Sequence, residues 1–164
     1  MHVLLSLGSN LGDRAGNLRA ALQLLRQHAG IRLASISHSY ETEPWGKLNQ
    51  PGFLNMAAEI WTELAPMELL NAVKAIESQL GRESNTRWGP RVIDIDLILW
   101  GALTLDSDML VLPHPSFRER AFVLMPLAEI AGGAVDPVTG LTVAALAVRP
   151  EARGAVRRLG PISP

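Results

Sequence analysis

Apolar residues recur along the chain at two spacings, and each spacing predicts a different kind of element. Short apolar runs, some with every second residue polar, predict strands at residues 3–7, 31–40, 53–62 and 92–100. Apolar residues three and four apart predict two amphipathic helices, one starting at Asp13 and one running from Pro66 to Gly81. Their predicted core stripes are Leu18, Ala21, Leu22 and Leu25, and then Leu69, Leu70, Val73, Ile76 and Leu80.

These elements follow the order strand, helix, strand, strand, helix, strand, which is the ferredoxin-like β-α-β-β-α-β plan. We therefore expect an α+β fold in which helices pack on one face of an antiparallel sheet. C-terminal additions follow, with short strands around Asp106 and Asp108 and helical pieces over 121–131 and 141–148. The polar, proline-containing residues 149–164 predict a loosely ordered tail, within a single domain that spans residues 1–164.

Composition limits the classes of function that fit this fold. Hydrophobic residues make up 48% and charged residues 19% of the 164 residues, a balance typical of a globular domain with its own core. The chain has no cysteine, which excludes disulfides and thiol catalysis. Its 15 basic and 16 acidic residues give no bulk attraction for nucleic acid or anionic membranes. No apolar run approaches the ~20 residues of a membrane span, so we expect a cytoplasmic protein.

Two carboxylates interrupt the last predicted strand, which we expect to be buried. Side chains two apart on a strand share a face and lie about 6.6 Å apart, so Asp94 and Asp96 form a pair. Val92 and Ile98 are predicted on that same face, and the other face is predicted to carry Ile93, Ile95, Leu97 and Leu99. Two like charges this close call for a counter-charge, and oxygen ligands suit Mg²⁺.

A basic loop precedes the acid pair. This loop contains Arg82, Arg87 and Arg91, and Gly89-Pro90 prevents it from forming a helix or strand. Arginine side chains match the geometry of phosphate groups. Acids and arginines together suggest a metal–nucleotide site. The alternative is an edge strand with a solvated acidic face, beside a basic loop that makes surface ion pairs.

Several familiar active-site motifs are absent from the sequence. It contains no phosphate-binding G-x-x-x-x-G-K-[ST], no G-x-G-x-x-G, no G-x-S-x-G and no H-E-x-x-H. Among the histidines, only His114 looks placed for a role, because it lies between two prolines and is followed by Arg118 and Arg120. The loop from Glu41 to Gly52 is long for a compact domain, and such loops often serve as lids.

A series of motifs resembles one known family. In chain order they are Gly8-Ser9-Asn10-Leu11-Gly12, Gln50-Pro51 with Phe53-Leu54-Asn55, Gly81-Arg82, Arg87-Trp88-Gly89-Pro90-Arg91, Asp94-Ile95-Asp96, Pro113-His114-Pro115 and Arg120-Ala121-Phe122-Val123-Leu124. The set is similar to the hydroxymethyl-dihydropterin pyrophosphokinases of folate biosynthesis, from Val3 to about Val148. The resemblance implies transfer of pyrophosphate from ATP to the hydroxymethyl group of 6-hydroxymethyl-7,8-dihydropterin, with release of AMP.

The resemblance also implies roles for single residues. Asp94 and Asp96 hold two Mg²⁺ ions bound with ATP, and Arg82 and Arg91 contact its phosphates. The other positions that match the nucleotide site are Lys74, Glu77, His114 and Arg120. Those that match the pterin site are the aromatic residues Phe53, Phe122 and Trp88, the polar residues Thr42 and Asn55, and Asn10 and Trp45 in nearby loops.

The chain departs from the family pattern in the middle of the arginine loop. Ser84-Asn85-Thr86 is less basic than the segment it replaces, which bears on ATP affinity. Two other readings compete: a ferredoxin-like nucleic-acid binding module without catalysis, and a catalytically silent scaffold. The two acids disfavour nucleic-acid binding because they repel phosphates, and the retained acids and arginines disfavour the scaffold. We expect a monomer without an obligate protein partner.

Overall fold

The computed structural model describes residues 1–42, 52–81 and 92–164. Its centre is an antiparallel six-stranded sheet in the order β5-β1-β4-β3-β8, with β2 also paired to β4. The strands are β1 (His2–Ser9), β2 (Ile31–Ile36), β3 (His38–Thr42), β4 (Phe53–Thr62), β5 (Asp94–Trp100) and β8 (Val156–Pro161). Strands β1 and β4 lie at the centre, and this arrangement confirms the predicted ferredoxin-like order.

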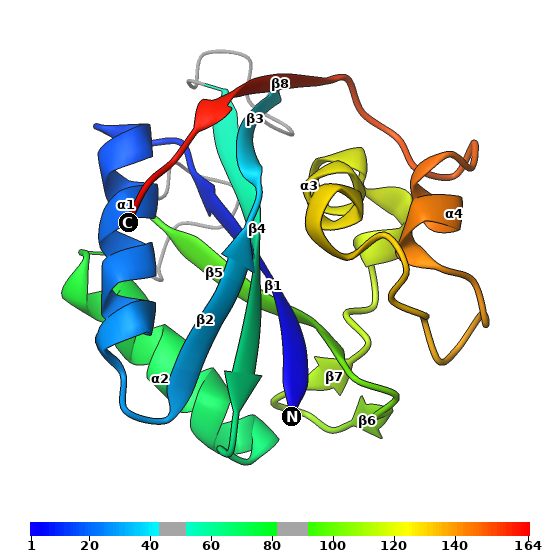
Figure 1. Ribbon diagram of the computed structural model, residues 1–164, viewed down its shortest axis with the longest axis horizontal. Helices are drawn as coiled ribbons and strands as arrows, with labels where there is room; N and C mark the ends of the chain where they lie inside the picture. Colours follow the sequence, from blue (N-terminus) through cyan, green and yellow to red (C-terminus); the bar gives the residue numbers. More distant parts are fainter. Residues whose placement is uncertain (43–51, 82–91) are drawn as a thin grey trace.

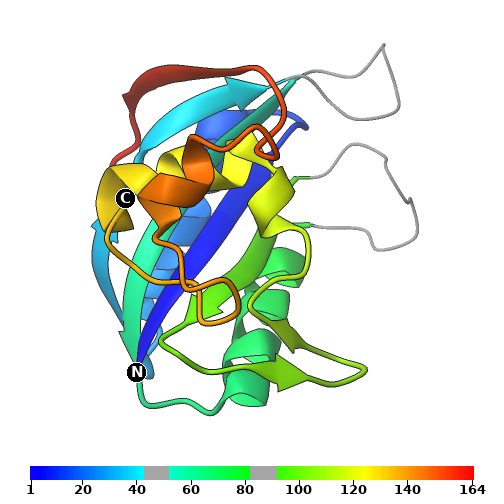
Figure 2. The same ribbon diagram turned by 90° about the vertical axis from the view of Figure 1, so that its right-hand side faces the viewer.

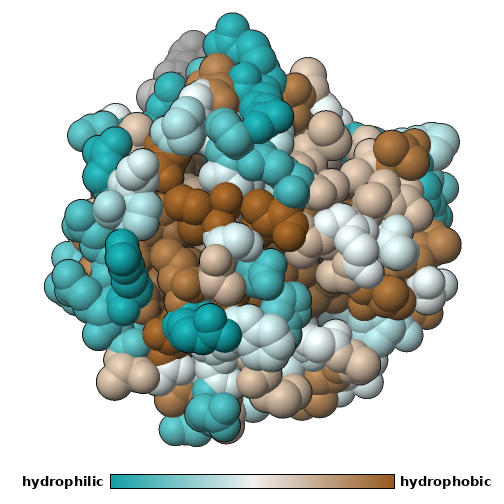
Figure 3. Space-filling model, viewed as in Figure 1, coloured by the Kyte–Doolittle hydropathy of each residue, from teal (hydrophilic) through white to brown (hydrophobic). Residues whose placement is uncertain are grey.

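Helices α1 (Arg14–Gln27) and α2 (Pro66–Gln79) cover one face of the sheet (Figure 1). Asp13 begins α1 by accepting the backbone N–H of Gly16 at 3.0 Å, and Pro66 begins α2. The predicted stripe of α1 is fully buried against Leu5, Leu7 and Met56 of the sheet. The opposite side of α1 is polar, and Figure 3 shows hydrophilic side chains over it at the left, with apolar ones between α1 and α3. The amphipathic pattern therefore predicted this layer correctly.

The C-terminal elements cover the other face, which the sequence prediction had left open. Helix α3 (Ala121–Ala131), the 3₁₀ turn Phe117–Glu119 and α4 (Val143–Ala147) lie in front of the sheet in Figure 2. They bury a second core in which Phe117 and Leu124 pack with Leu4 and Ala57. The prediction that helices cover one face of the sheet is therefore incomplete, and the molecule has three layers.

Two irregularities change which side chains face which layer. The pairing of β1 with β5 shifts after Leu5–Leu97, which leaves Ile98 as an extra residue. As a result Leu99 packs in the second core rather than with Ile93, Ile95 and Leu97, so its predicted face is wrong. The predicted strand over 31–40 is likewise split at Ser37, whose Oγ accepts the Ala57 N–H at 2.8 Å.

The chain after residue 149 is more ordered than predicted. Strand β8 pairs with β3, so that Arg158 lies opposite Tyr40, and Ile162 is 6% exposed in the first core. The prediction of a loosely ordered tail is therefore wrong for this segment. The predicted short strands are confirmed as β6 (Leu105–Asp106) and β7 (Val111–Leu112). Within the described ranges, no helix is both long and apolar enough to cross a membrane.

Candidate functional site

A row of four paired residues crosses the sheet on the face that carries α3. The pairing places Asp94 of β5 opposite Gly8 of β1, Gly8 opposite Asn55 of β4, and Asn55 opposite Tyr40 of β3. In the next row towards the centre of β1, Asp96 lies opposite Ser6. Because paired residues point to the same side of a sheet, the acid pair and Asn55 share one face, separated by a residue without a side chain.

Gly8 is required by this close approach, not by a turn. A Cβ atom at Gly8 would lie 2.8 Å from Asn55 Oδ1 and 3.6 Å from Phe53 Cδ1. Strand β1 continues through Ser9, so Gly8 lies inside the strand, whereas Gly12 in the same motif has a positive φ of +69°. Gly8 thus leaves room for the Asn55 amide and a gap between it and Asp94.

Asn55 holds a buried polar atom whose partner is missing from the described residues. The residue is 3% exposed, and its Nδ2 has no hydrogen-bond partner among them. An unsatisfied buried amide costs about 1–3 kcal/mol, so a native protein retains one where a ligand or another group completes it. The Asn55 amide is therefore the strongest indication of a ligand site on this face.

The acid pair lies on an edge strand and is less buried than predicted. Strand β5 ends the sheet on one side, Asp94 is half-buried and Asp96 is exposed, whereas residues 97–100 are buried. The prediction of a buried strand is thus wrong at its carboxylates. Glu77 of α2, which is 5% exposed, accepts the backbone N–H of Ile95 between them at 2.8 Å. Lys74, one turn earlier on α2, is exposed.

Two same-face carboxylates with access to solvent fit Mg²⁺, which takes one or two protein carboxylates and completes its shell with water and phosphate oxygens. In the described part of the chain, no cluster of three or more histidine, cysteine, aspartate or glutamate side chains could hold a metal. Water and the phosphate oxygens of a nucleotide would complete the shell of a metal held by these two carboxylates.

His114 is held beside this face in its neutral form. Its backbone N–H donates to the Ile98 carbonyl of β5 at 2.9 Å, and its Nδ1 accepts the Ser116 N–H at 3.1 Å. Burial, with a further contribution from the Arg120 charge, lowers the pKa of His114 to about 4. With Nδ1 accepting, the ring proton is on Nε2, where it can be donated to an anionic oxygen.

The described part of the site also includes Arg120 and Phe122 at the start of α3, and the ends of β3 and β4. The Arg120 guanidinium lies 5.7 Å from the Phe122 ring centroid, where α3 begins. Phe53 and Phe122 are both half-buried, and Thr42 pairs with Phe53 next to the Tyr40–Asn55 pair. The structure therefore brings the predicted pterin residues Thr42, Phe53 and Asn55 together on adjoining strands.

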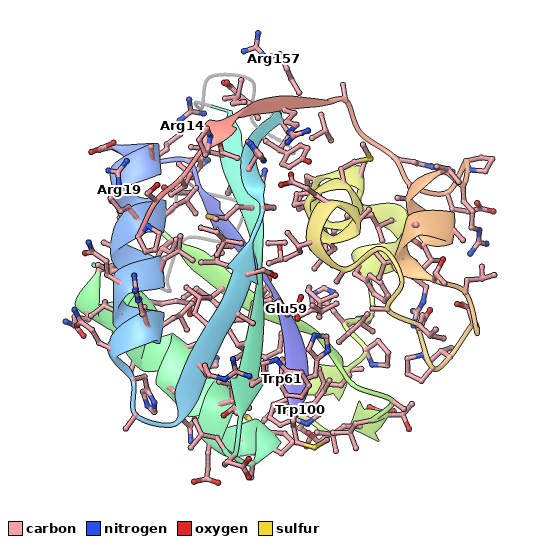
Figure 4. The ribbon with its side chains drawn as sticks, viewed as in Figure 1. Arg14, Arg19, Glu59, Trp61, Trp100 and Arg157 are labelled. Atoms are coloured by element: carbon pink, nitrogen blue, oxygen red, sulfur yellow. The ribbon has the colours of Figure 1, made fainter. Side chains whose placement is uncertain are left out.

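Asn10, directly after β1, is fully buried, and the remaining predicted site residues lie outside the described residues. They are Trp45, Arg82, Trp88 and Arg91, together with the Ser84-Asn85-Thr86 segment. Gly52 is the first described residue after residue 51, and its carbonyl accepts a 2.6 Å hydrogen bond from Arg14. Arg14 also contacts Glu41 at 3.4 Å. Figure 4 shows Arg14 and Arg157 at this same end of the molecule, and Arg157 contacts Glu41 as well.

The sequence prediction missed the pair formed by Tyr40, the last residue of the row, and Glu129 of α3 behind it. Tyr40 was noticed only as an apolar strand position, and Glu129 not at all, yet Tyr40 donates its hydroxyl to Glu129 at 2.7 Å. No local pattern marks this pair, because its members lie 89 positions apart in the sequence. A hollow of about 450 Å³ beside Arg14 and Ile162 lies on the α1 side, away from the acid pair.

Comparison with known proteins agrees with this arrangement. Residues 4–132 match the family described as 7,8-dihydro-6-hydroxymethylpterin-pyrophosphokinase (HPPK). The 2-amino-4-hydroxy-6-hydroxymethyldihydropteridine pyrophosphokinase of Bacillus subtilis is 49% identical over 126 residues, which cover 77% of this chain and 75% of that protein. The mitochondrial folate synthesis bifunctional protein of Arabidopsis thaliana is 43% identical over 148 residues, which are 90% of this chain and 26% of that protein.

A solved structure supports the fold independently. Plasmodium falciparum HPPK-DHPS wild type with pteroate superposes with a TM-score of 0.71, at 15% identity, over 89% of this chain and 43% of that one. At this identity the likeness shows the fold alone. From the family match and the close relatives, the chain belongs to the 7,8-dihydro-6-hydroxymethylpterin-pyrophosphokinases, ATP-dependent enzymes of folate biosynthesis.

Proposed function

We propose that pyrophosphate transfer takes place on the α3 face of β5, β1 and β4, with the acceptor beside Asn55 and the phosphates beside Asp94 and Asp96. The observation that carries this assignment is the buried Asn55 Nδ2, which has no hydrogen-bond partner within the described ranges. Asn55 and Asp94 are both paired with Gly8, on opposite sides of β1. A pterin ring has acceptor and donor atoms along its edge, so it can complete an amide that the protein leaves unsatisfied.

The acceptor pocket combines aromatic faces with a fixed polar edge. Phe53 and Phe122 supply ring surfaces on which a flat heteroaromatic ring can stack, with a gain of about 0.5–1.5 kcal/mol per favourable aromatic pair. Asn55 and Thr42 provide hydrogen-bonding groups from adjoining strands. Because the strands are paired, these groups are held in place before the ligand arrives, which lowers the entropic cost of binding. Trp45, Trp88 and Asn10 stay predictions for this pocket.

The nucleotide side is proposed to take ATP, and Asp94 and Asp96 are the residues that would hold its two Mg²⁺ ions. These ions would supply charge neutralisation and orientation of the phosphates. His114 is proposed to donate a hydrogen bond from Nε2–H to a phosphate oxygen, without transfer of the proton, and Arg120 adds positive charge where α3 begins. Lys74, Glu77, Arg82 and Arg91 stay predictions for nucleotide binding. The buried Glu77 also supports the strand that carries the acids.

The proposed reaction is a single displacement at phosphorus. The acceptor hydroxyl oxygen forms a bond to the β-phosphorus of ATP, and the bond from that phosphorus to the oxygen bridging the α- and β-phosphates breaks. The bridging oxygen leaves with its electron pair as part of AMP, and the hydroxyl proton passes to a phosphate oxygen or solvent. The chain's contribution is to align the two substrates and to stabilise charge.

Product analysis tests this proposal. The protein is incubated with ATP, Mg²⁺ and 6-hydroxymethyl-7,8-dihydropterin, and the nucleotides are separated by chromatography. We expect AMP in equal amount to pterin pyrophosphate, with no AMP when either pterin or metal is omitted. ADP as the product would place the attack on the γ-phosphorus and contradict the proposal. A monomer without an obligate protein partner remains the expectation from the sequence.

A further inference from the structure

One carboxylate joins α3 to the strand that carries the proposed polar edge. The side chain of Glu129, two residues before the end of α3, makes all its described contacts with β3 and β8. Its Oε1 and Oε2 accept the backbone N–H of His38 at 3.2 and 3.0 Å, and Oε2 lies 2.7 Å from His38 Nδ1. Oε1 also accepts the Tyr40 hydroxyl at 2.7 Å. A single side chain thus holds β3 at two consecutive same-face positions.

The other end of the same helical face carries Phe122. Residues seven apart on a helix lie on one side, two turns from each other, so Phe122 and Glu129 both face the sheet about 10 Å apart along the axis. On β3, Tyr40 pairs with Asn55 and Thr42 pairs with Phe53. Glu129 therefore ties the helix that carries one proposed ring contact to the strand that aligns the others.

Strand β3 needs such a tie because it does not continue β2. The two strands are separated at Ser37. Its N–H donates to the Ala57 carbonyl at 3.0 Å, but the Ala57 N–H donates to the Ser37 hydroxyl instead of to a backbone carbonyl. His38 is the first residue after this break, and it is the residue whose backbone Glu129 holds. The position of β3 beside β4 is thus supported by a contact from α3 in addition to the pairing of β3 with β4 and β8.

We propose that Glu129 is a positioning residue for the acceptor, which sets the distance between Phe122 and the Asn55–Thr42 edge through Tyr40 and His38. This inference rests on the proposed function of that edge. Glu129 touches neither substrate nor metal in this account. It acts by fixing β3, so its loss is expected to weaken acceptor binding while leaving ATP binding, at the other strand edge, unchanged.

Glu129 stays ionised and Tyr40 stays protonated across the neutral pH range. The charged and titratable groups that face Glu129 are His38, Tyr40 and Arg158, the last with its Nε 3.9 Å from Oε1. Burial alone would raise the pKa of Glu129, but hydrogen bonds from His38 and Tyr40 outweigh it and lower the pKa below its usual value. Burial and the Glu129 carboxylate raise the pKa of Tyr40 to about 12, so its hydroxyl remains a donor.

Steady-state kinetics of three variants tests the proposal. Glu129→Ala removes every contact, Glu129→Gln keeps the shape with one acceptor oxygen, and Tyr40→Phe removes one hydrogen bond only. We expect the pterin KM to rise about tenfold or more in Glu129→Ala and less in the other two, since a displacement near 1 Å can cost about a hundredfold. The ATP KM is expected to stay within about twofold of wild type.

A matched control separates positioning from loss of stability. Thr142→Ala removes the side-chain oxygen that accepts the Ala145 N–H at 3.1 Å at the start of α4, on the same side of the sheet but away from β3. This change lowers the melting temperature without touching the acceptor edge. A pterin KM that rises in the Glu129 and Tyr40 variants but not in Thr142→Ala supports the inference.

Other outcomes overturn it. Equal rises in the pterin and ATP KM values, or a pterin KM that follows the melting temperature in all four variants, would assign Glu129 a purely structural role. If Glu129→Ala does not fold, Tyr40→Phe decides in the same way. A wild-type protein that forms no pterin-dependent AMP would remove the proposed function and this inference with it. Active wild type with unchanged KM values in the variants would remove this inference alone.

Discussion

The gap at Gly8 gives the sharpest prediction, because a single methyl group placed there tests the role of Asn55. In Gly8→Ala the new Cβ would lie 2.8 Å from Asn55 Oδ1, whereas ordinary contacts begin at 3.4 Å. The amide oxygen must therefore move by about 3.4 − 2.8 = 0.6 Å or rotate away. The Phe53 Cδ1 atom lies 3.6 Å from the same methyl group, so the methyl group cannot shift far towards Phe53 to relieve the contact. The backbone itself accepts alanine, because Gly8 has no positive φ.

The expected size follows from the hydrogen bonds that the amide offers a ligand. Each neutral hydrogen bond contributes about 0.5–1.5 kcal/mol, so loss of two weakens acceptor binding by about 1–3 kcal/mol, or roughly 5- to 150-fold. Folding stability is expected to change little. Replacing a glycine in an allowed conformation gains about 0.4–1 kcal/mol from the unfolded state, which offsets part of the local strain.

Titration of pterin binding, together with thermal unfolding, provides the assay. Asn55→Ala serves as the reference variant, because it shows how much pterin affinity is lost when the amide is removed completely. Gly133→Ala is the matched control, because the same methyl group there meets no atom within 4 Å. We expect Gly8→Ala to approach Asn55→Ala in pterin affinity while ATP affinity and melting temperature stay near wild type. Pterin affinity within twofold of wild type in Gly8→Ala would refute the reasoning.

Three further predictions address the acids and His114. Asp96→Asn should lower turnover by about a hundredfold or more without changing the melting temperature, since Asp96 is exposed; near-normal turnover contradicts its metal role, and Asp106→Asn, an exposed acid on β6, is the control. Asp136 is fully buried and bonded to Arg118 at 2.6 and 2.9 Å, which after the opposing effect of burial lowers its pKa from 3.8 to about 2. The ionised Asp136 carboxylate, with its bonds from Arg118, Thr139 and Val138, therefore contributes about 2 kcal/mol of stability above pH 4 that is lost as pH falls towards 2. Urea unfolding should show this pH dependence of stability in wild type and not in Asp136→Asn; an equal pH dependence in both would contradict it. The NMR signals of the carbon-bound ring protons of His114 should titrate near pH 4, because partial burial and the Arg120 charge lower its pKa to about 4; a midpoint near 6.5 would contradict the half-buried, neutral ring.

The sequence predicted the elements well where one physical rule acts alone. The stripe of Leu18, Ala21, Leu22 and Leu25 is fully buried, since helical periodicity decides which side chains reach the core. The extra residue at Ile98 and the break at Ser37 could not be predicted, because both depend on pairing with β1 and β4. The pairing of β8 with β3 is a contact between distant segments, and a polar, proline-containing sequence gives little local signal for it.

The sequence predicted the acidic residues of the site, but not the roles of Gly8, Tyr40 and Glu129 that position its other groups. Two acids with strand spacing predicted a same-face pair, and the structure places Asp94 and Asp96 opposite Gly8 and Ser6 on one face. The sequence showed Gly8 as part of a motif. Why a glycine is needed there, to leave space for Asn55, can be seen only from the register of β1 with β4. Tyr40 and Glu129 come from distant segments, so only the packing of α3 on β3 brings them together.

The most direct measurement is the structure of the protein with Mg²⁺, a non-hydrolysable ATP analogue and 6-hydroxymethyl-7,8-dihydropterin. The account predicts metal on the carboxylates of Asp94 and Asp96, and the pterin edge hydrogen-bonded to the Asn55 amide so that Nδ2 is no longer unsatisfied. The acceptor hydroxyl should face the β-phosphorus across the gap at Gly8. A pterin bound elsewhere, or metal on other residues while Asp94 and Asp96 stay solvated, would contradict the account.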